Sequence, residues 1–125
     1  MPNHIHLLLT FKKPEEIKKF QLRFMTFTAQ QIKFNLRDHH PDVLRRFKST
    51  NGDREYQFWQ RNAKVIELKS YPEINRLLDY IHHNPMSKKW MLSTSPINYK
   101  YSSARFYETG EKNFDFLSHI GVLER

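Results

Sequence analysis

The chain has 125 residues, a formal net charge of +8 and no cysteine. Its length predicts one domain, residues 1–125, with a single hydrophobic core. The lack of cysteine excludes disulfides and cysteine-ligated zinc, no apolar run approaches the ~20 residues of a membrane span, and the positive charge favours a polyanionic partner.

Residues 4–11 predict a strand that carries His4 and His6. Because alternate side chains of a strand share a face, the two imidazoles should point the same way, roughly 7 Å apart. Such a pair can bind one divalent ion. Two histidines at this spacing also commonly decorate the exposed face of a strand, so the motif by itself leaves both interpretations open.

Pro14, Glu15 and Glu16 open a long predicted helix over residues 15–36, with proline in the first turn and acids at the positive end of the helix dipole. Its apolar residues follow two stripes, so we expect it to pack on two sides, against a sheet and against a second helix or subunit. The stripes are Ile17, Phe20, Phe24 and Phe27, and Leu22, Met25, Ala29, Ile32 and Leu36.

Residues 38–54 carry turn signals around a short segment from Val43 to Phe47, and His39 and His40 there are expected to be solvated. Residues 56–61 and 64–69 then predict two strands joined by a turn near Asn62. Trp59 fits a core anchor, although aromatic residues mixed with Gln and Arg also suit stacking on unpaired bases.

Ser70 to Glu73 form a predicted capping box, and Asn84-Pro85 should end the helix that follows. Tyr80 lies at the edge of the apolar stripe of this helix, and Asn84 lies one turn further on. By themselves these residues also fit a core-edge tyrosine and a helix C-cap. Near the C-terminus we expect a short closing helix, with Phe114, Phe116, Leu117 and Ile120.

Four ordered blocks resemble the single-tyrosine HUH transposases, and among them the REP-associated tyrosine transposases. The blocks are residues 1–7 (MPNHIHL), 58–62 (FWQRN), 79–85 (DYIHHNP) and 101–107 (YSSARFY). The resemblance implies an α+β fold, a ferredoxin-like or RRM-like antiparallel sheet with helices packed on it, and an enzyme that cuts and rejoins single-stranded DNA.

The resemblance also implies roles for individual residues. His4 and His6 match the metal-binding histidines, which would hold Mg²⁺ or Mn²⁺, and Tyr80 matches the nucleophile that forms a 5′-phosphotyrosine. Asn84 occupies the position of a third metal ligand that is glutamine in many relatives, with His83 as a substitute.

The implied substrate is single-stranded or hairpin DNA. We expect the protein in the cytoplasm of a bacterial-type cell, associated with the nucleoid. Lys and Arg side chains would hold its phosphates while aromatic side chains stack on its bases. The candidate DNA-binding residues are Lys12, Lys13, Arg45, Arg46, Arg61, Lys88 and Lys89.

The chain departs from this family at its start, because relatives carry a strand and a helix before the histidine strand. Their absence would leave an open sheet edge. We therefore expect either a shortened gene product or a homodimer that covers the edge.

Two other functions fit the same residues. The chain could be a catalytically inactive nucleic-acid-binding module, for which basic charge and aromatic segments suffice. It could also be a metal-dependent nuclease that uses activated water, with Tyr80 in a structural role.

Overall fold

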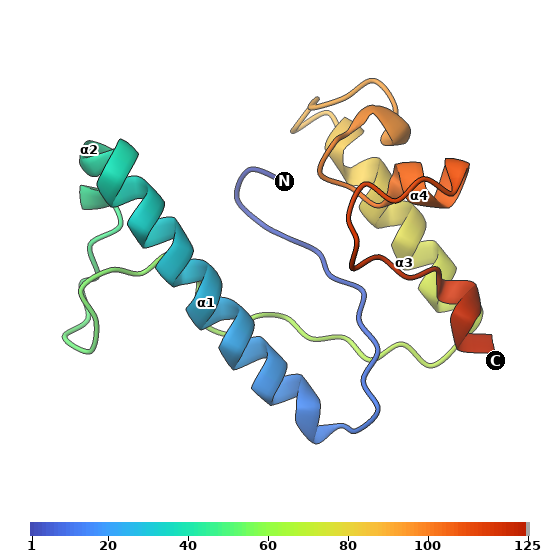
Figure 1. The fold of residues 1–125 in the computed structure, drawn as a ribbon, viewed down its shortest axis with the longest axis horizontal. Helices are drawn as coiled ribbons and strands as arrows, with labels where there is room; N and C mark the ends of the chain where they lie inside the picture. Colours follow the sequence, from blue (N-terminus) through green and yellow to red (C-terminus); the bar gives the residue numbers. More distant parts are fainter. Residues whose placement is uncertain (125) are drawn as a thin grey trace. The chain divides into compact units, whose positions relative to one another are not determined.

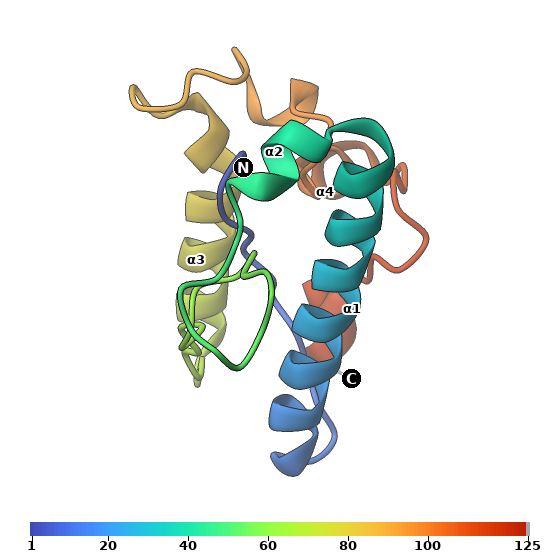
Figure 2. The same cartoon turned by 90° about the vertical axis from the view of Figure 1, so that its left-hand side faces the viewer.

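The computed structural model of the protein describes residues 1–124, with side chains up to residue 122. Helices joined by long irregular segments make up the chain (Figure 1 and Figure 2). The α-helices are α1 (Glu15–His39), α2 (Pro41–Arg45), α3 (Tyr71–His83) and α4 (Ala104–Thr109), and the 3-10 helices are η1 (Asn84–Met86), η2 (Pro96–Asn98) and η3 (Ile120–Glu124).

The chain divides into two compact units, which we describe separately. The terminal unit combines Met1–Leu8 with the chain from Glu67 onward, and the central unit is Leu9–Ile66. Whether the two units together form the single domain expected for residues 1–125 is not tested by this division, so that expectation stays a prediction.

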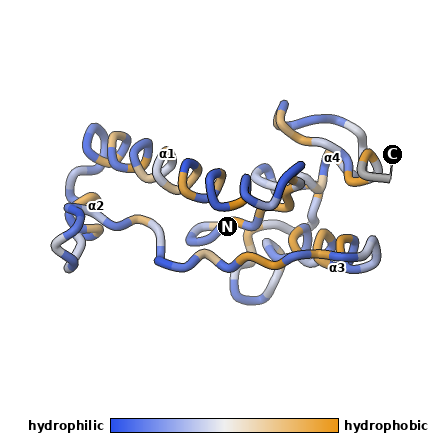
Figure 3. Tube along the Cα trace, turned by 90° about the horizontal axis from the view of Figure 1, so that it is seen from below, coloured by the Kyte–Doolittle hydropathy of each residue, from blue (hydrophilic) through white to orange (hydrophobic). Residues whose placement is uncertain are grey.

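Helix α1 dominates the central unit and confirms the helix predicted after Pro14. Glu15 and Glu16 occupy its first turn, and Arg37 and His39 its last, as the helix dipole favours. Hydrophobic and hydrophilic residues alternate along it (Figure 3). No residue of α1 is fully buried, and Phe27 of the first apolar stripe and Leu22 of the second are exposed, so part of each stripe remains uncovered within the central unit.

The first apolar stripe of α1 packs against aromatic side chains from both ends of the central unit. Phe20 lies between Phe11 and Phe24, with ring centroids 5.7 and 5.6 Å away, and Phe24 lies 6.4 Å from Trp59. The indole N–H of Trp59 donates to the Thr28 hydroxyl at 2.9 Å. Trp59 is therefore an anchor of this unit.

The predicted α+β fold with a ferredoxin-like or RRM-like antiparallel sheet is wrong. Within residues 1–124 the only β pairing is one isolated antiparallel bridge between Lys48 and Tyr56. The predicted strands at 4–11, 56–61 and 64–69 are irregular segments, and their side chains Ile5, Val65 and Ile66 stay exposed. A strand needs a neighbour along its length to accept its backbone hydrogen bonds, and of these segments only 56–61 has one, limited to the bridge at Tyr56 and the bond from Gln57 to Phe47.

The correction of the fold also removes the argument for a homodimer from an open sheet edge. The expected homodimer would have covered the edge of a sheet that lacks its outer strand. Among the residues that the structure describes there is no sheet to leave open.

Helix α3 begins and ends where local sequence signals place it. The Ser70 hydroxyl accepts from the Glu73 backbone N–H at 3.4 Å, while the Glu73 carboxylate accepts from the backbone of Ser70 at 3.2 Å, which completes the predicted capping box. Helix α3 ends at His83, and Asn84 begins the short η1 turn with Pro85. The chain thus changes direction immediately after the last turn of α3.

The core of the terminal unit forms where α3, η1, α4 and η3 meet. Its buried members are Leu78, His82, Pro85, Ala104, Phe106 and Ile120. The predicted closing helix begins only at Ile120, since Phe114, Phe116 and Leu117 precede η3 and Phe116 is exposed.

The search for membrane-spanning helices gives a negative result over residues 1–124. None of the helices described there combines the length and the apolar character that a span requires.

Candidate functional site

The terminal unit brings the N-terminal histidines to the end of α3. The rings of His4 and His6 lie 5.0 Å apart, and His6 makes an edge contact with Tyr80, with ring centroids 5.9 Å apart. The carboxamide nitrogen of Asn84 lies 3.2 Å from Nε2 of His6. The four residues that the sequence singled out therefore lie together, although the predicted strand that was to carry the histidines is absent.

Helix geometry explains why Tyr80 and Asn84 reach the same partner. They are four residues apart, so they lie one turn apart on one side of the helix. The Asn84 backbone N–H donates to the Tyr80 carbonyl and continues the helical pattern to the cap. Asn84 thus combines its predicted C-cap position with a side chain that contacts His6.

The hydrogen bonds of the two histidines determine which ring nitrogen of each carries the proton. His4 Nδ1 lies 2.8 Å from the carbonyl oxygen of the Asn3 side chain, which can only accept, so Nδ1 carries the proton and Nε2 has a lone pair. The Asn84 amide donates to His6 Nε2, so that nitrogen also has a lone pair. Nε2 is therefore unprotonated in both imidazoles, but the lone pair of His6 Nε2 accepts from Asn84, so a metal ion at His6 would have to replace that hydrogen bond.

The electrostatic surroundings keep both histidines neutral. Partial burial lowers the pKa of His4, and nearby positive charges that include Lys89 lower it further. Burial also lowers the pKa of His6, with a further contribution from His4. A metal ion binds imidazole only in its neutral form, so these shifts favour ligation at neutral pH.

Trp90 and Asn3 are two neighbours of the site to which the sequence analysis gave no role. Trp90 lies 5.7 Å from His4, and the Lys89 ammonium lies 5.0 Å from the Trp90 ring. A turn after η1, in which the Trp90 N–H donates to the Ser87 carbonyl at 2.9 Å, positions this indole. The sequence placed Asn3 beside the histidine pair and Trp90 directly after Lys88 and Lys89. It gave no sign that both side chains contact His4, which the structure shows.

His82 and His83 point to other partners. His82 is 7% exposed, and its Nε2 lies 2.9 Å from the Ser103 hydroxyl at the start of α4. Burial lowers its pKa, so it is held neutral. His83 donates through Nδ1 to the Asp79 carbonyl at 2.8 Å. The hydrogen bond to His6 is thus made by Asn84, not by its suggested substitute His83.

The candidate DNA-binding cations are divided between the two units. Lys88 and Lys89 belong to the terminal unit, while Lys12, Lys13, Arg45, Arg46 and Arg61 belong to the central unit. Arg61 pairs with Asp53 at 3.0 Å, and Arg54 binds the same carboxylate at 3.1 Å. Arg61 is therefore partly neutralised, which makes it a weaker phosphate ligand than its charge suggests.

Comparisons of the chain with protein-family models, curated proteins and solved structures give no match.

The donor set fits a divalent cation of the Mg²⁺ or Mn²⁺ class. Two neutral imidazoles and one carboxamide are nitrogen and oxygen ligands, and Mn²⁺ accepts both kinds. No cluster of three or more His, Cys, Asp or Glu residues occurs within residues 1–124, so His4, His6 and Asn84 form a set with few ligands and no carboxylate. An octahedral ion takes six ligands, and three from the protein would leave positions for phosphate oxygens and water.

Tyr80 is the nucleophile candidate beside this donor set. Its side chain is 58% exposed, so a large substrate can reach its hydroxyl. The arrangement joins an accessible phenol to a set of metal ligands, which is the combination that attack on a phosphodiester requires.

Proposed function

We propose that this chain cleaves and rejoins single-stranded DNA as a single-tyrosine enzyme of the HUH transposase type. The observation that carries the proposal is the contact of His6 with both Tyr80 and Asn84, at 5.9 Å between ring centroids and 3.2 Å between nitrogens. The net charge of +8 supports a polyanionic substrate. The four sequence blocks that resemble these enzymes contain all of the residues involved.

The covalent step uses the Tyr80 hydroxyl. Its oxygen bonds to the phosphorus of the scissile phosphodiester, the bond from phosphorus to the 3′-oxygen breaks, and the 3′-oxygen takes a proton from solvent and leaves as a hydroxyl. The phenolic proton passes to solvent, which reaches this exposed side chain. The product is a 5′-phosphotyrosine, and a 3′-hydroxyl can reverse the attack to rejoin DNA without a nucleotide triphosphate.

The remaining residues prepare this step. His4, His6 and Asn84 would hold Mg²⁺ or Mn²⁺, which supplies charge stabilisation to the phosphate when bound. His6 contacts the Tyr80 ring edge and limits where the phenol can lie. Asn3 fixes the tautomer of His4 through its side-chain oxygen.

The experiment compares the wild type with Tyr80→Phe and Tyr101→Phe on denaturing gels. Each protein is incubated with a labelled pool of random-sequence single-stranded and hairpin oligonucleotides and MnCl₂. Tyr101 is a matched control, because it is 69% exposed, lies in the same unit and is distant from the histidines in sequence. We expect a covalent protein–DNA adduct in the wild type and in Tyr101→Phe, and its loss in Tyr80→Phe.

Two results would contradict the proposal. Metal-dependent cleavage without an adduct, unchanged in Tyr80→Phe, indicates a nuclease that uses water. Binding of the oligonucleotides with neither cleavage nor adduct indicates an inactive nucleic-acid-binding module.

A further inference from the structure

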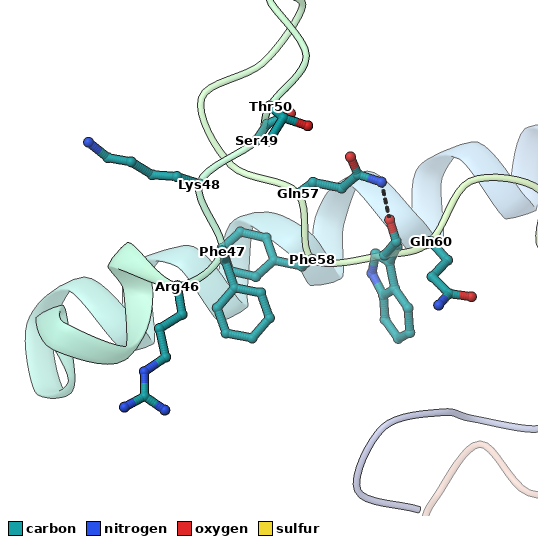
Figure 4. Close-up of a pocket in the computed structure, with 9 residues that line it drawn as sticks. Arg46, Phe47, Lys48, Ser49, Thr50, Gln57, Phe58 and Gln60 are labelled. Carbon is teal, nitrogen blue, oxygen red and sulfur yellow. Dashed lines mark hydrogen bonds between the residues drawn. The ribbon is translucent and has the colours of Figure 1, made fainter.

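The central unit contains a hollow of about 250 Å³ beside the isolated bridge (Figure 4). The segment after α2 forms one side, and residues 57–60 form the other. Backbone hydrogen bonds join the two sides, since Gln57 donates to the Phe47 carbonyl and Ser49 donates to the Glu55 carbonyl, both at 2.9 Å. The hollow is therefore formed by a hydrogen-bonded pair of segments.

Aromatic side chains form the apolar wall of this hollow. The rings of Phe47 and Phe58 lie 5.1 Å apart, and Trp59 is fixed by its hydrogen bond to Thr28. Phe47 remains 36% exposed despite these contacts. The Phe47 ring is tilted by 35° from that of Phe58 and is partly open to solvent, so a planar ring can stack on its exposed face.

Polar groups line the same hollow. The Gln57 amide nitrogen donates to the Trp59 carbonyl at 3.2 Å, which fixes the side chain and leaves its carbonyl oxygen as an acceptor. Thr50 and Gln60 add a hydroxyl and a second carboxamide, whereas the Ser49 hydroxyl is engaged with the backbone of Asn51. Such groups can hydrogen-bond the edge of a nucleobase, whose ring carries donors and acceptors.

Two cations lie at the hollow without an acidic partner. Arg46 and Lys48 line it and make no ion pair with the side chains of residues 1–122, whereas the nearby Arg54 and Arg61 share Asp53. No Asp or Glu lines the hollow. The charge complements a phosphate that is attached to the stacked ring.

We propose that this hollow binds one base of a single-stranded DNA segment, stacked on Phe47, with Arg46 and Lys48 on the adjoining phosphates. Its volume is below the roughly 300–1,000 Å³ of pockets for drug-sized ligands, so it fits one small planar group. The choice of DNA rests on the proposed function. The stacking site itself depends only on the central unit.

The test measures fluorescence anisotropy of a labelled deoxythymidine 12-mer with the full chain. Phe47→Ala should weaken binding roughly five- to hundredfold, the range for loss of one base–aromatic stack. Phe34→Ala is the matched control, since Phe34 is similarly exposed at 40%, lies in the same unit and does not line the hollow. Phe34→Ala should bind like the wild type.

Salt dependence separates stacking from phosphate contact. Arg46→Ala should reduce the slope of log Kd against log salt by about 0.7, the value for one phosphate of a single strand. Phe47→Ala should leave that slope unchanged. Arg23→Ala, which changes an exposed arginine of α1 outside the hollow, controls for general charge.

Each outcome decides the inference. An abasic 12-mer should bind the wild type as weakly as the deoxythymidine 12-mer binds Phe47→Ala. Equal loss in Phe34→Ala and Phe47→Ala, undiminished binding of the abasic strand, or binding of a uridine 12-mer but not of DNA would overturn it. Repeating the series in Tyr80→Phe keeps the tests separate, because binding there reports on the hollow even if no protein–DNA adduct forms.

Discussion

At the scale of single residues, Asn84 links the end of α3 to the histidine pair. Its amide nitrogen donates to His6 Nε2, the atom whose lone pair would otherwise bind a metal ion. The same carboxamide carries an oxygen that can itself be a ligand. Asn84 therefore holds His6 in position in this structure, and in the proposed metal site its side-chain oxygen would become a ligand once this hydrogen bond is replaced.

Replacing Asn84 tests this role. Asn84→Ala should weaken Mn²⁺ binding by at least about tenfold, the lower end for loss of a group that supports a metal ligand. Calorimetric titration with MnCl₂ measures the affinity, and Asn98→Ala, an exposed asparagine of the same unit, is the control. Wild-type affinity in Asn84→Ala would remove this residue from the site.

Ser103 has a structural role, because its hydroxyl is the hydrogen-bond partner of the buried His82. Ser103→Ala would leave the buried imidazole nitrogen unsatisfied, which costs about 1–3 kcal/mol in the free energy of unfolding. Urea denaturation measures the loss, and Ser118→Ala, at an exposed serine, should change stability little. A similar stability for both variants would show that the bond contributes nothing.

At the scale of elements, α3 depends on a cap formed by its own first residues. The backbone N–H groups of Lys69 and Ser70 donate to the Glu73 carboxylate at 3.0 and 3.2 Å. These bonds lower the pKa of Glu73 below its ordinary value, and the bond from Lys69 contributes most. The start of the helix that presents Tyr80 is therefore sensitive to acid.

The sign of this effect follows from linkage. A carboxyl whose pKa is lower in the folded state stabilises the fold above its unfolded pKa, and the stabilisation is lost as the pH falls through the lowered value. Glu73→Gln keeps a capping side chain but removes the titration. We expect the wild type to exceed Glu73→Gln in melting temperature at pH 6, with the difference closing toward pH 3. A difference independent of pH would contradict this expectation.

The elements also show which parts of the fold could be predicted from sequence. Proline in the first turn, the capping box and Asn84-Pro85 act within a few residues, so the predictions of α1 and α3 are confirmed. Strands depend on a distant partner, and the alternation in residues 4–11 could not show that this partner is lacking. His4, His6, Tyr80 and Asn84 still lie together, because their contacts require only that residues 4–6 reach the end of α3.

Other contacts of the site were beyond prediction for the same reason. The bond from His82 to Ser103 spans 21 residues, and the contact of Trp90 with His4 joins residues that the whole central unit separates in the sequence. No local sequence pattern around His82 or Trp90 indicates which distant residue each of them contacts. The hollow beside Phe47 likewise depends on pairing between two irregular segments.

At the scale of the whole molecule, 21 Lys and Arg residues outnumber 13 Asp and Glu residues. The exposed ion pairs leave this excess unchanged, because each joins a cation to an anion. Such a surface attracts a polyanion over distances set by ionic strength. The strength of DNA binding should accordingly depend on salt.

A salt titration measures this dependence. If four of the seven candidate cations contact phosphates of a single strand, raising NaCl from about 50 to 200 mM should weaken binding roughly fiftyfold. Anisotropy of the labelled 12-mer in Tyr80→Phe isolates binding from cleavage. An affinity that does not change with salt would contradict a phosphate-binding surface.

The central claim is that Tyr80 forms the bond to DNA, and peptide mapping of the adduct tests it most directly. Trypsin should release residues 77–88, between Arg76 and Lys88, a peptide whose only tyrosine is Tyr80. After nuclease treatment, mass spectrometry should find a 5′-nucleotide on Tyr80 of this peptide in the wild-type sample with MnCl₂. A nucleotide on any other residue, or an unmodified Tyr80 in a sample that contains cleaved DNA, would contradict the account.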